Sequence, residues 1–475
     1  MEWGCEMKFS LFNHYVDAPM WVLAMLEGSI LIFAVHMAVT LRFASLPAED
    51  LVLFGPIFPR AVVVAVVMLT LKVALGMYNT DSKWGKWQHY SIYLACYFLG
   101  FVFLSVIYYL FPEMLLGRGV LGLSLALGFM GVLTLRVLYF GLLDGETRGR
   151  RVLVIGAGSR SASIASLIES NNTVNRFELK GFISLPNEVA DKKLVEGEYL
   201  LPNGMPLLSL VRQYEVDEVV VGVRQRRGGE LSMTELLECR LEGINVIDLS
   251  SFYERETGKI LLESVNPSWM VYSGGFNRGA IKNIIKATQD MIVSFVLLIV
   301  FAPIMLLTAI AIKLDSRGPV FYRQQRVGEC GEVFDVLKFR SMTVDAEKEG
   351  KPQWAVKNDV RVTRVGKVIR LLRIDEIPQI INVLKGEMSF VGPRPERPHF
   401  VNELTRQIPY YAARHTVKPG VTGWAQVRYP YGASVDDARQ KLQYDLYYAK
   451  NHSWFLDLIV LFQTVQVVLF GKGAR

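Results

Sequence analysis

The sequence predicts a membrane protein in three parts: an N-terminal four-helix transmembrane block, a Rossmann-like α/β middle domain, and a mainly α C-terminal domain with a re-entrant membrane helix. Hydrophobic residues make up 51% of the 475-residue chain and gather in runs of membrane-spanning length. In the middle of the chain, short apolar strands alternate with helices. A fifth apolar run, near residue 300, contains a proline. We therefore expect domains at 1–147, 148–275 and 276–475, with the re-entrant helix at 290–313, and we exclude a purely soluble protein.

Four apolar runs in the N-terminal part each match the roughly 20 helical residues that cross a hydrocarbon core of about 30 Å. They are Met20–Leu41, Leu51–Tyr78, Ser91–Phe111 and Val120–Leu143. One set of flanking loops contains Lys8, Lys83, Lys86, Arg148, Arg150 and Arg151, whereas the other set contains Arg42 and Arg118. Because Lys and Arg are retained on the cytoplasmic side, both ends of this block are expected in the cytoplasm.

Charged and polar side chains also lie inside these spans, namely Glu27, His36, Arg60, Lys72 and Arg136. Such residues mark transport paths in some membrane proteins. One acid and one histidine do not form a proton relay, and long basic side chains can pack between helices or reach the membrane surface. Packing is therefore preferred to transport here.

The middle domain begins with a buried strand at Arg151–Gly156, followed by a helix that runs to Ile168. Further strands are expected at Phe177–Ser184, Glu218–Val223 and Asn245–Leu249. Gly156 and Gly158 match the first half of a GxGxxG turn, in which backbone N–H groups approach a phosphate. The third position is Ser161, no acidic residue follows the second strand to hold a ribose, and no Tyr-x-x-x-Lys pair occurs. A structural or regulatory domain is favoured over a working NAD site, and a membrane-bound NAD-dependent nucleotide-sugar dehydratase remains the alternative.

The net charge limits the classes of binding partner, and the cysteine spacing limits the kinds of metal and disulfide site. Lys and Arg total 52 against 45 Asp and Glu, a net charge of +7 that suits nucleic acid, acidic lipid or an anionic substrate. Membrane spans make nucleic acid the least suitable, and none is expected as a partner. Cys5, Cys96, Cys239 and Cys330 show no paired spacing, so neither a zinc site nor a disulfide framework is indicated.

The fifth apolar run, Met291–Ile312, has two interpretations. A full span would carry everything after Lys313 outside, whereas a helix bent at Pro303 would dip into the membrane and return. Basic residues flank both ends of the run, so they do not orient it as a span. A re-entrant helix with both ends cytoplasmic is preferred.

Residues suited to phosphate chemistry follow this run. Asp375 and Glu376 are adjacent carboxylates, surrounded by Arg370, Arg373 and Arg394. A carboxylate can attack phosphorus to give an acyl phosphate, and its neighbour can hold Mg²⁺. Arginine binds phosphate oxygens with two parallel hydrogen bonds. The alternative is an ordinary solvated helix start with ion pairs.

Four motifs occur in one order: GPVFYRQQRVG at 318–328, KFRSM at 338–342, DEIPQIINVLKGEMSFVGPRP at 375–395, and KPGVTGWAQV at 418–427. Together they resemble the bacterial sugar transferase family, the monotopic polyprenyl-phosphate phosphoglycosyl transferases that start exopolysaccharide or O-antigen units. The segment at 429–434 resembles an exosortase-associated subgroup of that family. The family commonly has Ser-Pro at the break of its re-entrant helix, where this chain has Ala302-Pro303.

The resemblance implies a reaction and roles for named residues. Asp375 is the expected nucleophile, which takes a hexose-1-phosphate from a UDP-sugar and releases UMP. Glu376 is expected to bind Mg²⁺. Four basic residues are expected to bind phosphate or substrate: Arg370, Arg394, Lys338 and Arg340. A polyprenyl phosphate, such as undecaprenyl phosphate, then attacks the phospho-aspartate to give a polyprenyl-diphosphate-sugar, the first membrane step of exopolysaccharide synthesis.

This reaction also predicts a location. UDP-sugars are cytoplasmic, so the expected enzyme is a multi-pass protein of the bacterial inner (cytoplasmic) membrane with its catalytic domain in the cytoplasm. Membrane lipid is an expected partner, and a homodimer is left open. Phe455–Phe470 fits an interfacial helix or a core helix almost equally well. A non-catalytic scaffold for polysaccharide assembly is a further alternative, and no residue identifies the sugar.

Overall fold

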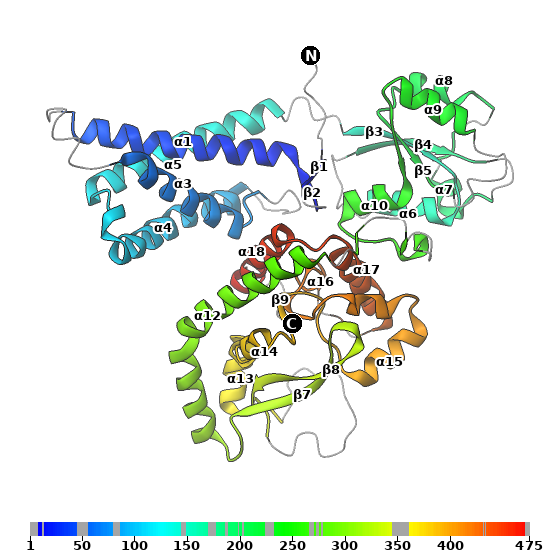
Figure 1. Cartoon of the computed structure of the whole chain (residues 1–475). Helices are drawn as coiled ribbons and strands as arrows, with labels where there is room; N and C mark the ends of the chain where they lie inside the picture. The colour runs from blue at the N-terminus through cyan, green and yellow to red at the C-terminus, as the bar shows by residue number, and fades with distance from the viewer. Residues whose placement is uncertain are drawn as a thin grey trace. The chain divides into compact units, whose positions relative to one another are not determined.

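The computed structural model describes residues 8–11, 14–44, 56–78, 86–143, 149–169, 177–185, 189–197, 199–201, 204–223, 232–265, 270–271, 275–276, 279–343, 361–430, 432 and 434–470. The chain divides into two compact units (Figure 1). The first comprises Met1–Leu11 and Tyr15–Glu256, and the second comprises Phe12–His14 and Thr257–Arg475. The last domain is predicted to start at 276; in the structure, Ile260 and Val265 pack in the core of the second unit.

The N-terminal part begins with β1 (Lys8–Leu11) and β2 (His14–Asp17), which form a two-stranded sheet. Four long apolar helices follow: α1 (Ala18–Arg42), α3 (Ile57–Ala74), α4 (Lys86–Leu110) and α5 (Arg118–Leu143), with the short η1 (Pro112–Met114) between the last two. Each of the four predicted spans thus contains one of these apolar helices. Residues 51–55 of the second span lie outside the described residues, as do Lys83 and Arg148.

The interior of this four-helix block contains a buried charge cluster. Glu27 on α1 accepts from Lys72 Nζ at 2.8 Å and from Arg136 Nε at 2.6 Å. The hydroxyl of Tyr78 donates to the same carboxylate at 2.6 Å. Glu27 and Lys72 are fully buried. The prediction that basic residues pack between the helices is confirmed for Lys72 and Arg136.

The middle domain is a parallel sheet with strand order β4-β3-β5-β6. The strands are β3 (Arg150–Ile155), β4 (Phe177–Ile183), β5 (Glu218–Val221) and β6 (Asn245–Asp248), at the predicted positions. The helices are α6 (Ser159–Glu169), α7 (Lys192–Glu196), α8 (Leu207–Gln213), α9 (Met233–Leu241) and α10 (Leu249–Thr257). Figure 1 shows α8 and α9 on one side of the sheet and α6 and α10 on the other.

The Gly156–Gly158 turn of this domain forms a backbone hydrogen bond to a neighbouring strand of the same domain. The amide of Gly156, at φ 102°, donates to the Ile183 carbonyl at 2.8 Å. Ser161 is buried against Gly222, where an added Cβ would lie 2.1 Å from the Ser161 hydroxyl. The third position of the turn therefore contributes close helix–strand packing.

The second unit is mostly helical. Its helical elements are η2 (Leu262–Ser264), α12 (Ala280–Asp315), η3 (Glu329–Gly331), α13 (Arg364–Leu371), η5 (Ile374–Glu376), α14 (Gln379–Leu384), α15 (Pro398–Gln407), η6 (Tyr411–Thr416), α16 (Trp424–Arg428), α17 (Val435–Asn451) and α18 (Trp454–Phe470). Its strands are β7 (Phe321–Val327), β8 (Val333–Phe339), β9 (Ser389–Val391) and β10 (Gly420–Thr422). The first two form an antiparallel hairpin, and the last two pair in parallel.

The core of this unit includes Trp424, which stacks on Tyr447 and donates from its indole to the Gly258 carbonyl at 2.8 Å. Trp424 is thus a buried core residue of this unit. His14 also belongs to this unit, and its Nδ1 lies 2.7 Å from the Tyr447 hydroxyl. An N-terminal residue thus completes the packing of the C-terminal unit.

Helix α12 contains the fifth apolar run and extends beyond it at both ends, with Pro303 inside the helix. Figure 1 shows two arms that meet at a bend. At 1.5 Å per residue, its 36 residues measure about 54 Å along the helix. Within the described residues, α1, α3, α4, α5 and α12 are long and apolar enough to cross a membrane, by length and composition.

Candidate active site

The two adjacent carboxylates lie just after a sharp change in backbone direction. Helix α13 ends at Leu371, and Arg373 adopts a left-handed conformation with φ 57°. For a residue other than glycine, such a conformation costs of order 1–3 kcal/mol. The short η5 follows and contains Asp375 and Glu376. Because this single turn is not part of a longer helix, the two neighbouring carboxylates enter different environments.

Glu376 lies in a cluster of basic side chains from three separate elements. Its Oε1 is 3.1 Å from Lys338 Nζ on β8 and 3.5 Å from an Arg394 guanidinium nitrogen after β9. Arg373 reaches its other oxygen at 3.9 Å. Burial alone raises the pKa of Glu376, but Lys338, Arg394 and Arg373 together hold this pKa at about 2. Glu376 is therefore a fixed negative charge at neutral pH.

The pKa of Asp375 is shifted in the opposite direction to that of Glu376. Burial raises the pKa of its carboxyl, the charge of Glu376 raises it further, and Lys338, Arg370 and Arg373 only partly oppose this rise. Its Oδ1 is buried, and no described residue hydrogen-bonds to it. A desolvated carboxylate oxygen without a donor is a more reactive nucleophile than a solvated one, because it does not first lose hydrogen bonds.

The structure brings four of the candidate site residues together: Lys338, Arg394, Asp375 and Glu376. Arg370 lies on α13 and acts on Asp375 through its charge. Arg340 is different. Its guanidinium donates to the carbonyls of Ser316 and Arg317 at 2.8 Å, and to the Ser316 hydroxyl at 2.9 Å. It therefore satisfies the C-terminal end of α12, and its three acceptors are all protein groups.

Replacing Arg340 by Met is expected to lower the thermal stability of the protein. The substitution leaves two carbonyls at the end of α12 without their donor, a loss of about 1–3 kcal/mol for hydrogen bonds from a charged group. The midpoint of thermal unfolding of the purified protein measures it. Arg317→Met is the control, because this neighbour is exposed and the change in charge is equal. Equal midpoints for the two variants would contradict the capping role.

Two arginines that sequence analysis did not assign hold the turn that carries Arg394. Arg414 donates to the carbonyl of Arg394 at 2.8 Å and pairs with Asp445, also at 2.8 Å. Arg326 donates to the carbonyl of Pro395 at 3.0 Å. The alternation of side chains along the strands could have identified Arg326 as a neighbour of the site, because it lies on the same face of the hairpin as Lys338. For Arg414, 20 residues away from Arg394, the sequence offered no such signal.

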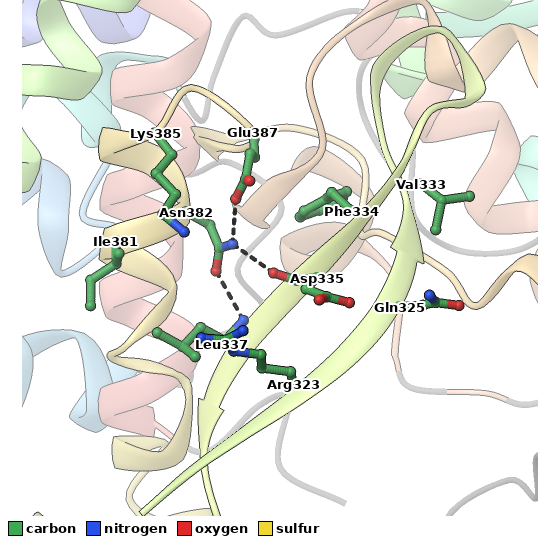
Figure 2. A pocket seen from close by; sticks show the side chains of 10 residues that line it. All are labelled: Arg323, Gln325, Val333, Phe334, Asp335, Leu337, Ile381, Asn382, Lys385 and Glu387. Atoms are coloured by element: carbon green, nitrogen blue, oxygen red, sulfur yellow. Dashed lines mark hydrogen bonds between the residues drawn. The ribbon is translucent and has the colours of Figure 1, made fainter.

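A cavity of about 380 Å³ is lined by residues of the β7–β8 hairpin and by residues of α14 and the segment after it (Figure 2). Asn382, which is buried in its wall, accepts from the Leu337 amide at 2.9 Å and donates to the Asp335 carbonyl at 2.8 Å and to Glu387 at 2.7 Å (Figure 2). Leu337 and Asp335 occupy the strand face opposite Lys338. Asn382 therefore joins α14, directly after the carboxylates, to β8, which carries Lys338.

The carboxylates suit a magnesium ion that is shared with a substrate. Mg²⁺ prefers oxygen ligands and commonly takes one or two carboxylates together with substrate phosphates. The described residues contain no group of three or more His, Cys, Asp and Glu that could form a metal site. The free Oδ1 of Asp375 leaves room for an outside partner. Glu376 is the carboxylate that was expected to bind Mg²⁺, and within the described residues such an ion would need further oxygen ligands from a substrate diphosphate.

His415 is buried beside Arg414. Burial and the charge of Arg414 lower its pKa to about 4. The imidazole is therefore neutral at pH 7. Asp445 makes the ion pair with Arg414 described above.

Comparison with known proteins gives matches over this unit and beyond. The model of a family described as bacterial sugar transferase matches residues 281–471. Over 441 residues, the chain is 32% identical to a UDP-glucose:undecaprenyl-phosphate glucose-1-phosphate transferase of Xanthomonas campestris pv. campestris, covering 89% of this chain and 90% of the relative. A second relative is a UDP-N-acetylgalactosamine-undecaprenyl-phosphate N-acetylgalactosaminephosphotransferase of Aeromonas hydrophila, 45% identical over 240 residues.

The extent of these matches differs. The Aeromonas alignment covers 50% of this chain and 56% of that protein. An undecaprenyl-phosphate glucose phosphotransferase of Komagataeibacter xylinus is 34% identical over 331 residues, which are 68% of this chain and 60% of the relative. The chain thus matches less than two thirds of these two relatives, and nearly the whole of the Xanthomonas protein.

Proposed function

The chain belongs to the bacterial sugar transferase family, and on this basis we propose that it transfers a sugar-1-phosphate from a UDP-sugar to undecaprenyl phosphate. The observation that carries the proposal is the pair of carboxylates: Asp375, whose Oδ1 is buried and unbonded, beside Glu376 in a cluster of basic groups. This pair offers a nucleophile and a binding place for phosphate within one turn of chain.

The proposed reaction has two steps. The Asp375 carboxylate attacks the phosphorus that carries the sugar, and the bond from that phosphorus to the oxygen bridging the two phosphates breaks. UMP leaves with the bridging oxygen, and the sugar phosphate stays on Asp375 as an acyl phosphate. An oxygen of undecaprenyl phosphate then attacks the same phosphorus. The bond to Asp375 breaks, which restores the carboxylate and releases undecaprenyl-diphosphate-sugar.

The surrounding basic residues bind the phosphates in this proposal. Lys338 and Arg394 already lie within 3.5 Å of Glu376, so that they flank the position of the incoming diphosphate. Arg370 adds positive charge on the side of Asp375. When bound, Mg²⁺ held by Glu376 would neutralise negative charge on the diphosphate. For Arg340, the contacts with α12 make a direct role in phosphate binding a weaker proposal.

We place this site at the cytoplasmic surface of the inner membrane, with α12 as a re-entrant helix bent at Pro303. Exposed apolar side chains on α12, such as Phe295 and Leu306, support its insertion into lipid. Val368 and Leu371 on α13 are exposed close to the carboxylates in sequence. An acceptor phosphate at the surface of the bilayer would thus lie near Asp375. The middle domain is proposed to be Rossmann-like and not catalytic.

The test is an assay of UMP release with undecaprenyl phosphate, Mg²⁺ and a panel of UDP-sugars. UDP-glucose and UDP-N-acetylgalactosamine come first, because they are the sugar donors in the names of the relatives. We expect release of UMP and a lipid-linked sugar with at least one donor. A well-folded protein that is inactive with every donor would favour the scaffold, and NAD carried by the purified protein would favour the dehydratase.

The pH dependence of UMP release is expected to depend on Glu376. Activity falls as the pH is lowered through the pKa of Asp375, which lies above its usual value, because the protonated acid is not a nucleophile. In the metal-free protein, replacing Glu376 by Gln removes a charge that raises the pKa of Asp375, so the acid limb of kcat/KM, measured with Mg²⁺ well below saturation, moves to lower pH. Profiles normalised to their maxima measure the shift, with the exposed Glu403→Gln as control. A limb that stays in place or moves to higher pH would contradict the assignment.

A further inference from the structure

A buried cluster joins the two apolar helices of the second unit, α12 and α18, to the core. Lys286 on α12 pairs with Asp457 on α18 at 2.6 Å. The Tyr448 hydroxyl on α17 lies 2.7 Å from the other oxygen of the same carboxylate. Tyr448 and Asp457 are at most 2% exposed. Both oxygens of Asp457 are therefore occupied, and the carboxylate is fixed.

The same two donors meet at one carbonyl of β9. Lys286 Nζ is 3.2 Å from the carbonyl of Val391, and the Tyr448 hydroxyl is 2.9 Å from it. A phenol has a single proton, which the charged carboxylate of Asp457 attracts at the shorter distance. Lys286, with three protons, can serve the carboxylate, the phenol oxygen and the carbonyl together. The ammonium is thus the main donor to Val391.

One helical turn further along α12, a second contact reaches the same strand. Asp290 accepts from the amide of Phe390 at 3.2 Å. The other edge of β9 pairs with β10, where Ser389 lies opposite Gly420 and Val391 opposite Thr422. Lys286 and Asp290 therefore bond the edge of β9 that β10 leaves open.

The strand held in this way leads directly to Arg394. Gly392 packs so closely on the next chain segment that an added Cβ would lie 2.2 Å from the Lys418 carbonyl. The amide of Gly420 donates to the carbonyl of Pro393 at 3.0 Å. Since proline also fixes its own φ, the turn has little freedom. A displacement of Val391 is therefore transmitted to Arg394, three residues later.

Stability alone does not account for the cluster. Removing two charges from water costs about as much as their attraction returns, and apolar residues of the same size often hold elements together equally well. Charged groups do, however, define a single geometry, because their hydrogen bonds are directional. Because the cluster holds the strand that directly precedes Arg394, its fixed geometry can determine the position of Arg394.

We propose that Lys286, Tyr448 and Asp457 are positioning residues for Arg394, so that the seating of α12 and α18 sets the geometry of the phosphate site. This inference rests on the proposed function. It adds that the two apolar helices act on catalysis through one backbone carbonyl, besides anchoring the unit.

A double-mutant cycle on the full-length protein in lipid nanodiscs tests the proposal. The kcat and KM for the UDP-sugar are measured for Asp457→Asn, Arg394→Lys and the double variant. We expect each single variant to lose about tenfold in kcat/KM, and the double variant to lose no more than Arg394→Lys alone. The reason is that Asp457 is proposed to act only through Arg394. Once Arg394 has been replaced by Lys, changing Asp457 therefore causes no additional loss of kcat/KM.

Further variants separate positioning from folding. Tyr448→Phe keeps the ring and removes the hydroxyl, and it serves if Asp457→Asn does not fold. Lys286→Arg is expected to restore much of the activity that Lys286→Met loses. Lys282→Met is the matched control, because it makes the same change at an exposed position one turn earlier on α12.

Losses that multiply in the double variant, or full activity of Asp457→Asn and Lys286→Met, would overturn the positioning role. Wild-type activity is measured in the same experiment and is a separate check of the proposed function. An active wild type with multiplying losses overturns the positioning role only. An inactive wild type overturns the proposed function and, with it, this role.

Discussion

Asp375→Asn is expected to reduce UMP release by at least about 10³-fold, because the amide keeps the shape of the side chain and removes the attacking oxygen anion. The neighbouring carboxylate, Glu376, does not replace it, because Glu376 is held by Lys338 and Arg394. The measurement is UMP release under saturating UDP-sugar. The same protein without acceptor lipid should release about one UMP per active site, and the Asn variant none.

The control for this experiment is Asp436→Asn, an exposed carboxylate at the start of α17. It makes the same chemical change outside the site and is expected to retain full activity. Thermal unfolding of both variants shows whether the fold is intact. Substantial UMP release by a folded Asp375→Asn protein would remove Asp375 as the nucleophile.

The candidate site could be predicted from the sequence where its residues belong to compact motifs. Asp375 and Glu376 are neighbours in the chain, and they are joined to Lys338 and Arg394 as expected. Arg340 looked equally suitable by residue type and spacing. In the structure it donates to two backbone carbonyls at the end of α12, a contact that no side-chain pattern reveals.

The helices of the four-helix block were predictable for a physical reason: a run of about 20 apolar residues leaves few alternatives to a helix in lipid. Contacts between distant segments were not predictable. Arg414 supports Arg394 across 20 residues, and His14 reaches Tyr447 across 433. Such pairs follow from packing of the whole unit. The contacts of Ile260 were not predictable for the same reason, since it joins a core formed by residues much later in the chain.

Glu27→Gln is expected to destabilise the four-helix block by about 3–5 kcal/mol, because it leaves Lys72 and Arg136 as buried cations without their counter-charge. Both oxygens of Glu27 are used, one by Arg136 and the other by Lys72 and Tyr78. The rings of two tyrosines near the Lys72 ammonium compensate only part of this loss. Thermal unfolding of the full-length protein in detergent measures the effect, with the exposed Glu113→Gln as control.

A triple variant distinguishes a structural cluster from a functional one. Replacing Glu27 by Leu, and Lys72 and Arg136 by Met, removes every charge at once, and such replacements are often neutral in stability. If the cluster only joins helices, the triple variant should unfold close to the wild-type temperature, well above Glu27→Gln, and keep its UMP release. A stable triple variant without activity would instead show that the charges act in the reaction. An unchanged unfolding temperature of Glu27→Gln would show that the block does not depend on the pairing.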